Sequence, residues 1–143
     1  MIDRERIAQY LDGFDRILED WKILKSEVSC KDIAEKRDIC HRVCYVMLVA
    51  IQTAIDMANL IIANEKLRRP SSYRESFEIL SAEKIISKEN ADVLKQLAGF
   101  RNYLVHQYVK LNYKRVCDNL KKGFNSLNYF RRAVGELTRK SAG

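Results

Sequence analysis

Proline and glycine are scarce in this chain of 143 residues, which holds one proline and five glycines. A β-sandwich or β-barrel needs turn residues about every ten residues, so the composition excludes these classes. The sequence has no run of about 18 uncharged apolar residues, and we therefore expect no transmembrane helix and no membrane partner. The N-terminal sequence MIDRERIAQYLDGFDR is charged throughout, unlike a signal peptide. We expect a soluble, cytoplasmic protein.

Potential metal ligands are also few. The chain has two histidines and four cysteines, Cys30, Cys40, Cys44 and Cys117. A structural zinc site usually shows two closely spaced ligand pairs, whereas Cys40 and Cys44, with His41 between them, form a single loose pair. We expect free, buried thiols, no metal site and no cofactor. A metal-binding cysteine pair is the less favoured alternative.

The positive charge is concentrated in the second half of the chain. Residues 1–64 hold 9 Lys/Arg against 11 Asp/Glu, a net charge of −2, and residues 65–143 hold 17 against 8, a net charge of +9. Such an asymmetry is what a site for a polyanion requires, and RNA is the expected partner. The alternative is that the charge serves solubility alone.

Apolar residues recur at three- and four-residue intervals, the period of helices buried on one side. The pattern predicts helices over residues 4–25, 30–65, 72–80, 88–99 and 112–138. Ser29 with Asp32, and Ser72 with Glu75, have the spacing of capping boxes, and Asn112 suits the N-cap of the last helix. We expect an all-α, four- to five-helix up-and-down bundle. It forms one domain over residues 1–143, with a tail that frays after about residue 138.

Residues 43–62 are apolar on most of the helix circumference, which indicates burial in the bundle and against a second subunit. A polar stripe nevertheless crosses this helix through Tyr45, Gln52, Asp56 and Asn59. Because a buried carboxylate needs a partner, we assign Arg101 as the partner of Asp56, with Gln52 in support. The alternative is a partly exposed Asp56 that has no role in a site.

The segment RNYLVHQY, residues 101–108, places Arg101, His106 and Tyr108 in the spacing Arg-x4-His-x-Tyr. RNA cleavage without a metal needs a cation for the phosphate and a base for the ribose 2′-hydroxyl. Arg101 supplies a permanent, forked cation. His106 belongs to the residue type that changes protonation near neutral pH, so it suits proton transfer to and from the ribose oxygens. The pattern predicts attack by the 2′ oxygen and a 2′,3′-cyclic phosphate product.

Two neighbours of the motif have supporting roles. Asn102 is a candidate hydrogen-bond donor to the phosphate, or the group that fixes the tautomer of His106. Tyr108 is a candidate to pack a base or ribose, or to hydrogen-bond the phosphate. The competing interpretation is structural, because a lone histidine in an apolar stretch is more often a core residue than a catalyst.

An ideal helix separates the motif residues. At about 100° per residue, Arg101 and Tyr108 lie some 20° apart, but His106 lies about 140° from Arg101. For both side chains to contact one phosphate, either the helix departs from regular geometry near Gly99 or the site is shared across a dimer. We expect both.

The ordered combination of an apolar helix (YVMLVAIQTAIDMANLII), a loop with a short helix (RPSSYRESFEIL) and the ending GFRNYLVHQY resembles the HEPN superfamily. Within it, the sequence is similar to the HepT group of bacterial and archaeal toxins over most of the chain. HEPN domains share the Arg-x4-His core, here Arg101 and His106, and the trailing tyrosine, here Tyr108, is typical of HepT. Many relatives carry an acidic residue where this chain has Asn112.

The resemblance implies a homodimeric, metal-independent endoribonuclease toxin with the two motifs facing each other at the subunit cleft. It also implies a partner, a minimal nucleotidyltransferase antitoxin that transfers AMP from ATP to the motif tyrosine, which is Tyr108. The added phosphate would place negative charge beside Arg101 and His106. Two alternatives stay open: a non-catalytic module that binds a nucleotide, RNA or the partner enzyme, and a purely structural bundle.

Overall fold

The computed structural model describes residues 3–107 and 109–142. Over these residues the chain forms six helices and no strand: α1 (Arg4–Glu27), α2 (Cys30–Glu35), α3 (Arg37–Asn64), α4 (Tyr73–Ala82), α5 (Lys88–His106) and α6 (Tyr113–Ala142). The predicted all-α bundle is confirmed, with six helices in the described residues instead of four or five. The last helix extends to Ala142, beyond the predicted end near residue 138.

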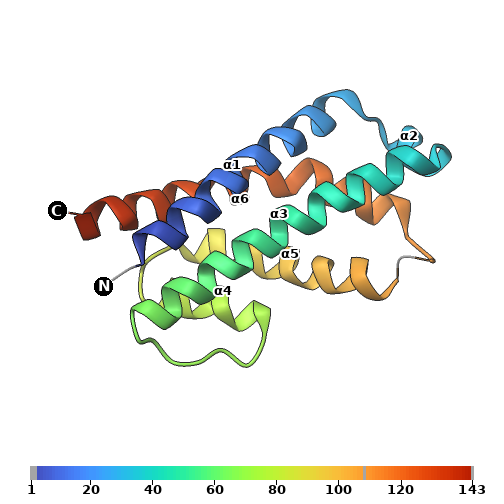
Figure 1. Ribbon diagram of the computed structural model, residues 1–143. Helices are drawn as coiled ribbons and strands as arrows, with labels where there is room; N and C mark the ends of the chain where they lie inside the picture. The colour runs from blue at the N-terminus through green and yellow to red at the C-terminus, as the bar shows by residue number, and fades with distance from the viewer. Residues whose placement is uncertain (1–2, 108, 143) are drawn as a thin grey trace.

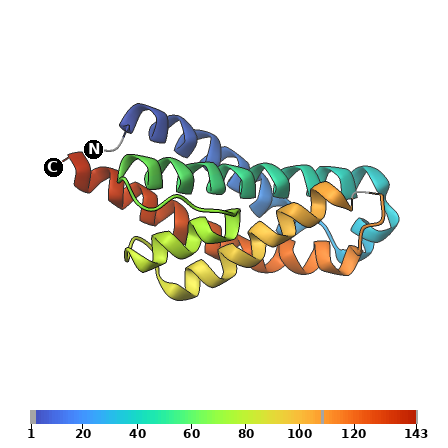
Figure 2. The ribbon, with the colours of Figure 1, turned by 90° about the horizontal axis from the view of Figure 1, so that it is seen from below.

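The centre of the bundle is α3, which packs against each of the other five helices. The long helices α1, α3, α5 and α6 run along the length of the molecule, and the short α4 lies beside α3 and α5 at one end (Figures 1 and 2). The beginning of α1 and the end of α6 lie at the same end of the bundle (Figure 1). This arrangement brings the Arg101 segment of α5 against the polar stripe of α3.

Residue patterns explain most helix ends. The side chains of Asp3, Ser72 and Ser87 accept hydrogen bonds from backbone amides in the first turns of α1, α4 and α5. Asn112 Oδ1 accepts from the Arg115 amide at 3.2 Å, as predicted for the N-cap of the last helix. A buried hydrogen bond joins α1 to α6, because Trp21 Nε1 donates to the Leu120 carbonyl at 2.8 Å.

The prediction of a single helix over residues 30–65 is wrong, because the helix is interrupted at Lys36, between α2 and α3. The Ser29–Asp32 capping box is present. The hydrogen bond from the Ser29 amide lowers the pKa of the Asp32 carboxyl below its ordinary value, and a hydrogen bond from the Lys36 side chain lowers it further. Lys36 has extended backbone angles (φ −112°, ψ 104°). The break lets α2 turn against α6 and bury Ile33, which is 1% exposed. Tertiary packing overrides a local sequence that lacks proline or glycine at this point.

By length and composition alone, one helix of the described residues, α3, is long and apolar enough to cross a membrane. Of its most apolar window, 56% is buried inside the bundle. A core helix of a soluble protein passes the same test, so this helix is weak evidence for a membrane span.

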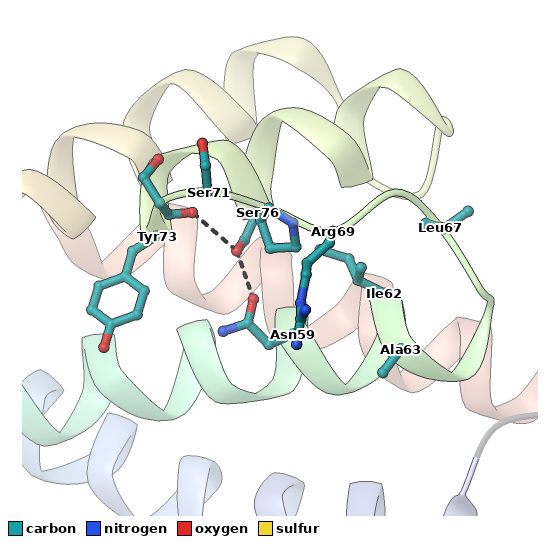
Figure 3. Close-up of a pocket in the computed structure, with 10 residues that line it drawn as sticks. Asn59, Ile62, Ala63, Leu67, Arg69, Ser71, Tyr73 and Ser76 are labelled. Atoms are coloured by element: carbon teal, nitrogen blue, oxygen red, sulfur yellow. Dashed lines mark hydrogen bonds between the residues drawn. The ribbon is translucent and has the colours of Figure 1, made fainter.

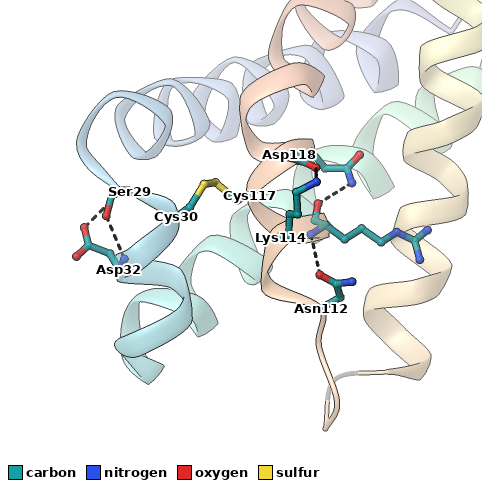
Figure 4. The surroundings of a disulfide bond; sticks show 9 residues. Ser29, Cys30, Asp32, Asn112, Lys114, Cys117 and Asp118 are labelled. Atoms are coloured by element: carbon teal, nitrogen blue, oxygen red, sulfur yellow. Dashed lines mark hydrogen bonds and ion pairs between the residues drawn. A yellow bond between two sulfur atoms is a disulfide. The ribbon is translucent and has the colours of Figure 1, made fainter.

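The cysteines are only partly free thiols. Cys30 at the start of α2 forms a disulfide with Cys117 of α6, with the two Cα atoms 5.4 Å apart (Figure 4). The prediction of free thiols is therefore wrong for this pair, because the break at Lys36 brings α2 to α6. Cys40 and Cys44 are free, and burial, together with neighbouring Cys40, raises the pKa of the Cys44 thiol to about 12.

We expect reduction of the disulfide to destabilise the fold. The bond closes a loop with a sequence separation of 87 residues, and the chain-entropy model assigns about 4.6 kcal/mol to such a closure. Thermal denaturation with and without dithiothreitol should show the oxidised protein melting about 15 °C higher. In Cys30→Ser the melting temperature should be low and insensitive to the reductant, whereas Cys44→Ser should respond as the wild type does. Equal melting temperatures for oxidised and reduced wild type would contradict this expectation.

Candidate functional site

The helix that carries the motif is continuous. α5 runs from Lys88 to His106 without a break, and its end is closed by the Gln107 amide, which donates to the Tyr103 carbonyl. The predicted departure near Gly99 is therefore wrong. Gly99 has no positive φ, and the Arg74 guanidinium of α4 lies over the space where a Cβ would stand, at 3.5 Å.

Arg101 is held from three sides. Its Nε donates to Gln52 Oε1 of α3 at 2.8 Å, and its Nη1 donates to Asn102 Oδ1 at 3.1 Å. Its Cζ lies 5.1 Å from the centroid of the Tyr73 ring, at the first turn of α4. A cation over an aromatic ring is attracted to its negative face. Together these contacts restrain a partly buried guanidinium in one place.

The polar stripe of α3 supplies that restraint through a relay. Gln52 Nε2 donates to Asp56 Oδ1 at 2.9 Å, one helical turn further along. The predicted direct contact between Asp56 and Arg101 is therefore wrong, because Gln52 lies between them. The carboxylate orients the Gln52 amide so that its oxygen faces Arg101. Tyr45, the first member of the stripe, is 65% exposed and takes no part in the relay.

The charge of Arg101 is not neutralised by an ion pair with a carboxylate among the described residues. Its two side-chain hydrogen bonds, to Gln52 and Asn102, use neutral amide oxygens, which leave the positive charge available. A guanidinium has five N–H donors in a fixed fork, so donors remain for an anion. This is the electrostatic requirement for a phosphate site.

His106 lies apart from Arg101 within one chain. It is the last residue of α5, it is exposed, and it makes no hydrogen bond with the described residues. Because α5 is regular between them, the two side chains diverge by about 140° and by about 7.5 Å along the axis. Asn102 contacts Arg101 rather than His106. Tyr108 lies outside the described residues.

A hollow of about 280 Å³ borders Arg101 on the α3 side. Leu48, Val49, Gln52 and Thr53 line it, and its surface is mostly apolar. Exposed Tyr45 stands one turn before Leu48. Among the residues that the structure describes, no three or more His, Cys, Asp or Glu side chains gather to hold a metal ion.

A family model, Ribonuclease HepT-like, matches residues 7–134. This chain belongs to the HepT-like ribonuclease family. The match spans the relay on α3 and the Arg-x4-His segment of α5, so it confirms the resemblance that the motifs indicated.

Curated relatives of this HepT-like chain are named as ribonucleases. The mRNA nuclease HepT of Shewanella oneidensis is 39% identical over 61 residues, which are 43% of this chain and 46% of that protein. The putative RNase YutE of Bacillus subtilis is 27% identical over 114 residues, 76% of this chain and 70% of that protein. The alignment thus spans less than half the length of the Shewanella relative.

Solved structures share the HepT-like fold. YutE of Bacillus subtilis, described as a cytosolic protein of unknown function, has a TM-score of 0.84 at 23% identity, covering 98% of this chain and 93% of that chain. A tri-AMPylated HEPN toxin of Shewanella oneidensis, solved in complex with an MNT antitoxin, has a TM-score of 0.82 at 24% identity, covering 95% and 99%.

Sequence reasoning about the HepT-like site missed Tyr73. The residue follows the Ser72 N-cap of α4, and its ring is the surface on which Arg101 rests. An aromatic residue at the start of a short, capped helix was the available signal. The sequence did not reveal that α4 folds back beside Arg101.

Proposed function

We propose that this protein is an endoribonuclease toxin that cleaves RNA without a metal, at a site shared between two copies of the chain. The observation that carries the proposal is the state of Arg101: a guanidinium fixed by Gln52 and Tyr73, free of any carboxylate among the described residues, in Arg-x4-His spacing with an exposed His106. The family and the names of the curated relatives support a ribonuclease.

The proposed reaction uses two side chains. Arg101 binds the scissile phosphate and stabilises the charge that grows on its oxygens. His106 takes the proton of the ribose 2′-hydroxyl while the 2′ oxygen forms a bond to phosphorus. The bond from phosphorus to the 5′ oxygen breaks, and the imidazolium returns a proton to that oxygen. The products are a 2′,3′-cyclic phosphate and a 5′-hydroxyl.

A homodimer would bring these two groups together. Because Arg101 and His106 diverge on one helix, a phosphate that contacts both needs a second copy of α5. The apolar hollow beside Arg101 and the exposed Tyr45 ring provide a surface for that copy. A two-fold axis places the same patch of both copies in contact and builds two equivalent sites.

The proposed control is a minimal nucleotidyltransferase antitoxin. A solved relative of the same fold is AMPylated and bound to an MNT antitoxin. In this chain the proposed acceptor is Tyr108, whose phenolic oxygen attacks the α-phosphate of ATP. An ester bond forms, pyrophosphate leaves and the phenolic proton is lost. The new phosphate competes with RNA phosphate for Arg101. We propose a cytoplasmic location, in line with the description of YutE as cytosolic.

A second candidate function is a non-catalytic module that binds RNA, a nucleotide or the partner enzyme. The divergence of Arg101 and His106 within one chain favours it, because a single subunit presents a phosphate anchor without a base beside it. Cleavage of RNA by purified protein in EDTA, with cyclic-phosphate ends, supports the nuclease. Salt-sensitive binding of intact RNA without cleavage would support the module instead.

Gln52→Ala tests the relay that positions Arg101. Without the Gln52 oxygen, the guanidinium loses a 2.8 Å acceptor and its orientation, and we expect RNA cleavage to fall about tenfold. Thr53→Ala is the matched control, since Thr53 lines the same hollow but donates to the Val49 carbonyl of its own helix. Initial rates of cleavage for the two variants check this expectation. Equal rates for Gln52→Ala and wild type would rule out a positioning role for Gln52.

A further inference from the structure

A second cavity, larger than the hollow beside Arg101, lies further along α3, beyond the Gln52–Asp56 relay. It has a volume of about 500 Å³ and lies between the second half of α3, the loop of residues 65–72 and the first turn of α4 (Figure 3). Its apolar wall consists of Ile62, Ala63, Leu67 and Pro70. Such a cavity, apolar with a few polar groups, is the usual form of a small-ligand site.

Tyr73 connects this cavity to the phosphate site. Tyr73 is one of the residues that line the cavity, and the Arg101 Cζ atom lies 5.1 Å from the centroid of its ring. A strand whose phosphate sits on Arg101 therefore has the cavity beside it. The Tyr73 ring offers a flat surface at the boundary, and bases stack on aromatic rings with about 1–3 kcal/mol each.

Asn59 presents a hydrogen-bond donor to the cavity. Ser76, which is fully buried, donates its hydroxyl to Asn59 Oδ1 at 2.6 Å and has the Ser72 carbonyl as a second, more distant acceptor at 3.4 Å (Figure 3). The shorter bond sets the orientation of the Asn59 amide. Asn59 Nδ2 makes no hydrogen bond with the described residues. Asn59, the fourth residue of the α3 polar stripe, thus has its amide oxygen bonded to Ser76 and its amide nitrogen available to donate to a ligand.

Arg69 supplies a second open donor. Hydrogen bonds to Glu75 restrain the loop before and after Arg69. Glu75 accepts from Arg68 Nη1 at 2.6 Å and from the Ser71 hydroxyl at 2.8 Å. Arg69 itself makes no hydrogen bond or ion pair among the described residues. In the view of Figure 3, its side chain and the Tyr73 ring stand on opposite sides of Asn59.

We propose that this cavity binds a nucleobase of the RNA strand next to the scissile phosphate, and that it prefers keto bases, uracil or guanine. Two open side-chain groups at the cavity, Asn59 Nδ2 and Arg69, are donors that cannot accept. They match the carbonyl oxygen at position 4 of uracil or position 6 of guanine, and they oppose the exocyclic amino donor that cytosine and adenine carry at the same positions. The inference rests on the proposed RNA substrate and assigns the specificity of cleavage to Asn59 and Arg69.

The test is a binding measurement that does not require cleavage. Short oligonucleotides of uridine or of cytidine, 2′-O-methylated throughout, cannot undergo 2′ attack, and their bases differ at position 4 by a carbonyl or an amino group. Fluorescence anisotropy on the full chain at fixed salt should give about tenfold tighter binding of the uridine oligomer. Asn59→Asp keeps the acceptor for Ser76 but replaces the donor, and it should abolish this preference.

Controls separate folding and charge from recognition. Arg69 is exposed, so Arg69→Ala should fold normally and should also lower the preference for uridine. Arg16→Ala removes an equal charge from α1, which packs against neither α4 nor α5, and should keep the preference. Uridine monophosphate alone is included as a competitor. Its binding should be much weaker than that of the oligomer, because it lacks the adjoining phosphate on Arg101.

Equal affinity of wild type for the two oligomers, or an unchanged preference in both Asn59→Asp and Arg69→Ala, would overturn the inference. Competition by uridine monophosphate at the affinity of the oligomer would make the cavity a site for free nucleotides and would overturn the RNA assignment. If the uridine preference is found but unmethylated RNA is not cleaved, the base site stands and the proposed nuclease fails.

Discussion

His106→Ala is expected to lower the rate of RNA cleavage by about 10³-fold while the fold is unchanged. General acid–base catalysis by a positioned side chain contributes about 10²- to 10⁴-fold. His106 is exposed at the end of α5 and makes no hydrogen bond with the described residues, so its removal leaves no cavity. Initial cleavage rates and the melting temperature, measured on the same preparations, check both parts of the expectation.

The chain supplies a matched control in its other histidine. His41 is exposed on α3 and belongs to no part of the Arg101 network. His41→Ala should cleave RNA at the wild-type rate. Cleavage by His106→Ala at the wild-type rate, with the same product ends, would remove His106 from the proposed reaction.

Arg101→Ala is expected to lower cleavage by about 10²- to 10³-fold and to weaken RNA binding. Loss of a donor to the developing charge has an effect of this size in other enzymes. Arg101→Lys keeps the charge but loses the fork and the Nε donor to Gln52, so it should recover only part of the rate. Cleavage rates and RNA affinities of the two variants, measured at one salt concentration, provide the comparison.

Arg132→Ala is the control for charge and for the aromatic contact. On α6, the Cζ atom of Arg132 lies 5.7 Å from the centroid of the Tyr129 ring. This contact resembles the one between Arg101 of α5 and the Tyr73 ring of α4. Its removal should leave cleavage unchanged. An equal loss in Arg132→Ala and Arg101→Ala would mean that overall charge, and not the fixed guanidinium, determines the activity.

Much of the fold was predictable because local patterns agreed with the final packing. The caps at Ser29 and Asn112 formed as expected. At Ser72 the N-cap bond formed, but Glu75 accepts from the Ser71 amide and not from that of Ser72, so the predicted capping box is incomplete. The apolar intervals marked the buried faces of α1, α3 and α6. Lys36 was not predictable, since its break depends on α2 docking against α6. The same docking creates the Cys30–Cys117 disulfide, which no spacing in the sequence indicates.

The site was predictable in composition and less so in geometry. Arg101, Gln52 and Asp56 were grouped correctly, but a side-chain relay replaced the expected ion pair because Gln52 reaches both groups. The role of Tyr73 depends on how α4 folds back, a long-range event that helix periodicity does not report. The roles of Asn102 and Tyr108 toward a phosphate, and the homodimer, stay predictions.

In the proposed nuclease, a metal-independent site forms from Arg101 of one copy and His106 of another. The most direct test is a heterodimer of Arg101→Ala and His106→Ala chains, purified by two different tags after co-expression and assayed on RNA in EDTA. One of its two shared sites keeps both groups, so we expect about half of the wild-type rate. Activity no higher than that of either variant alone would contradict a shared site.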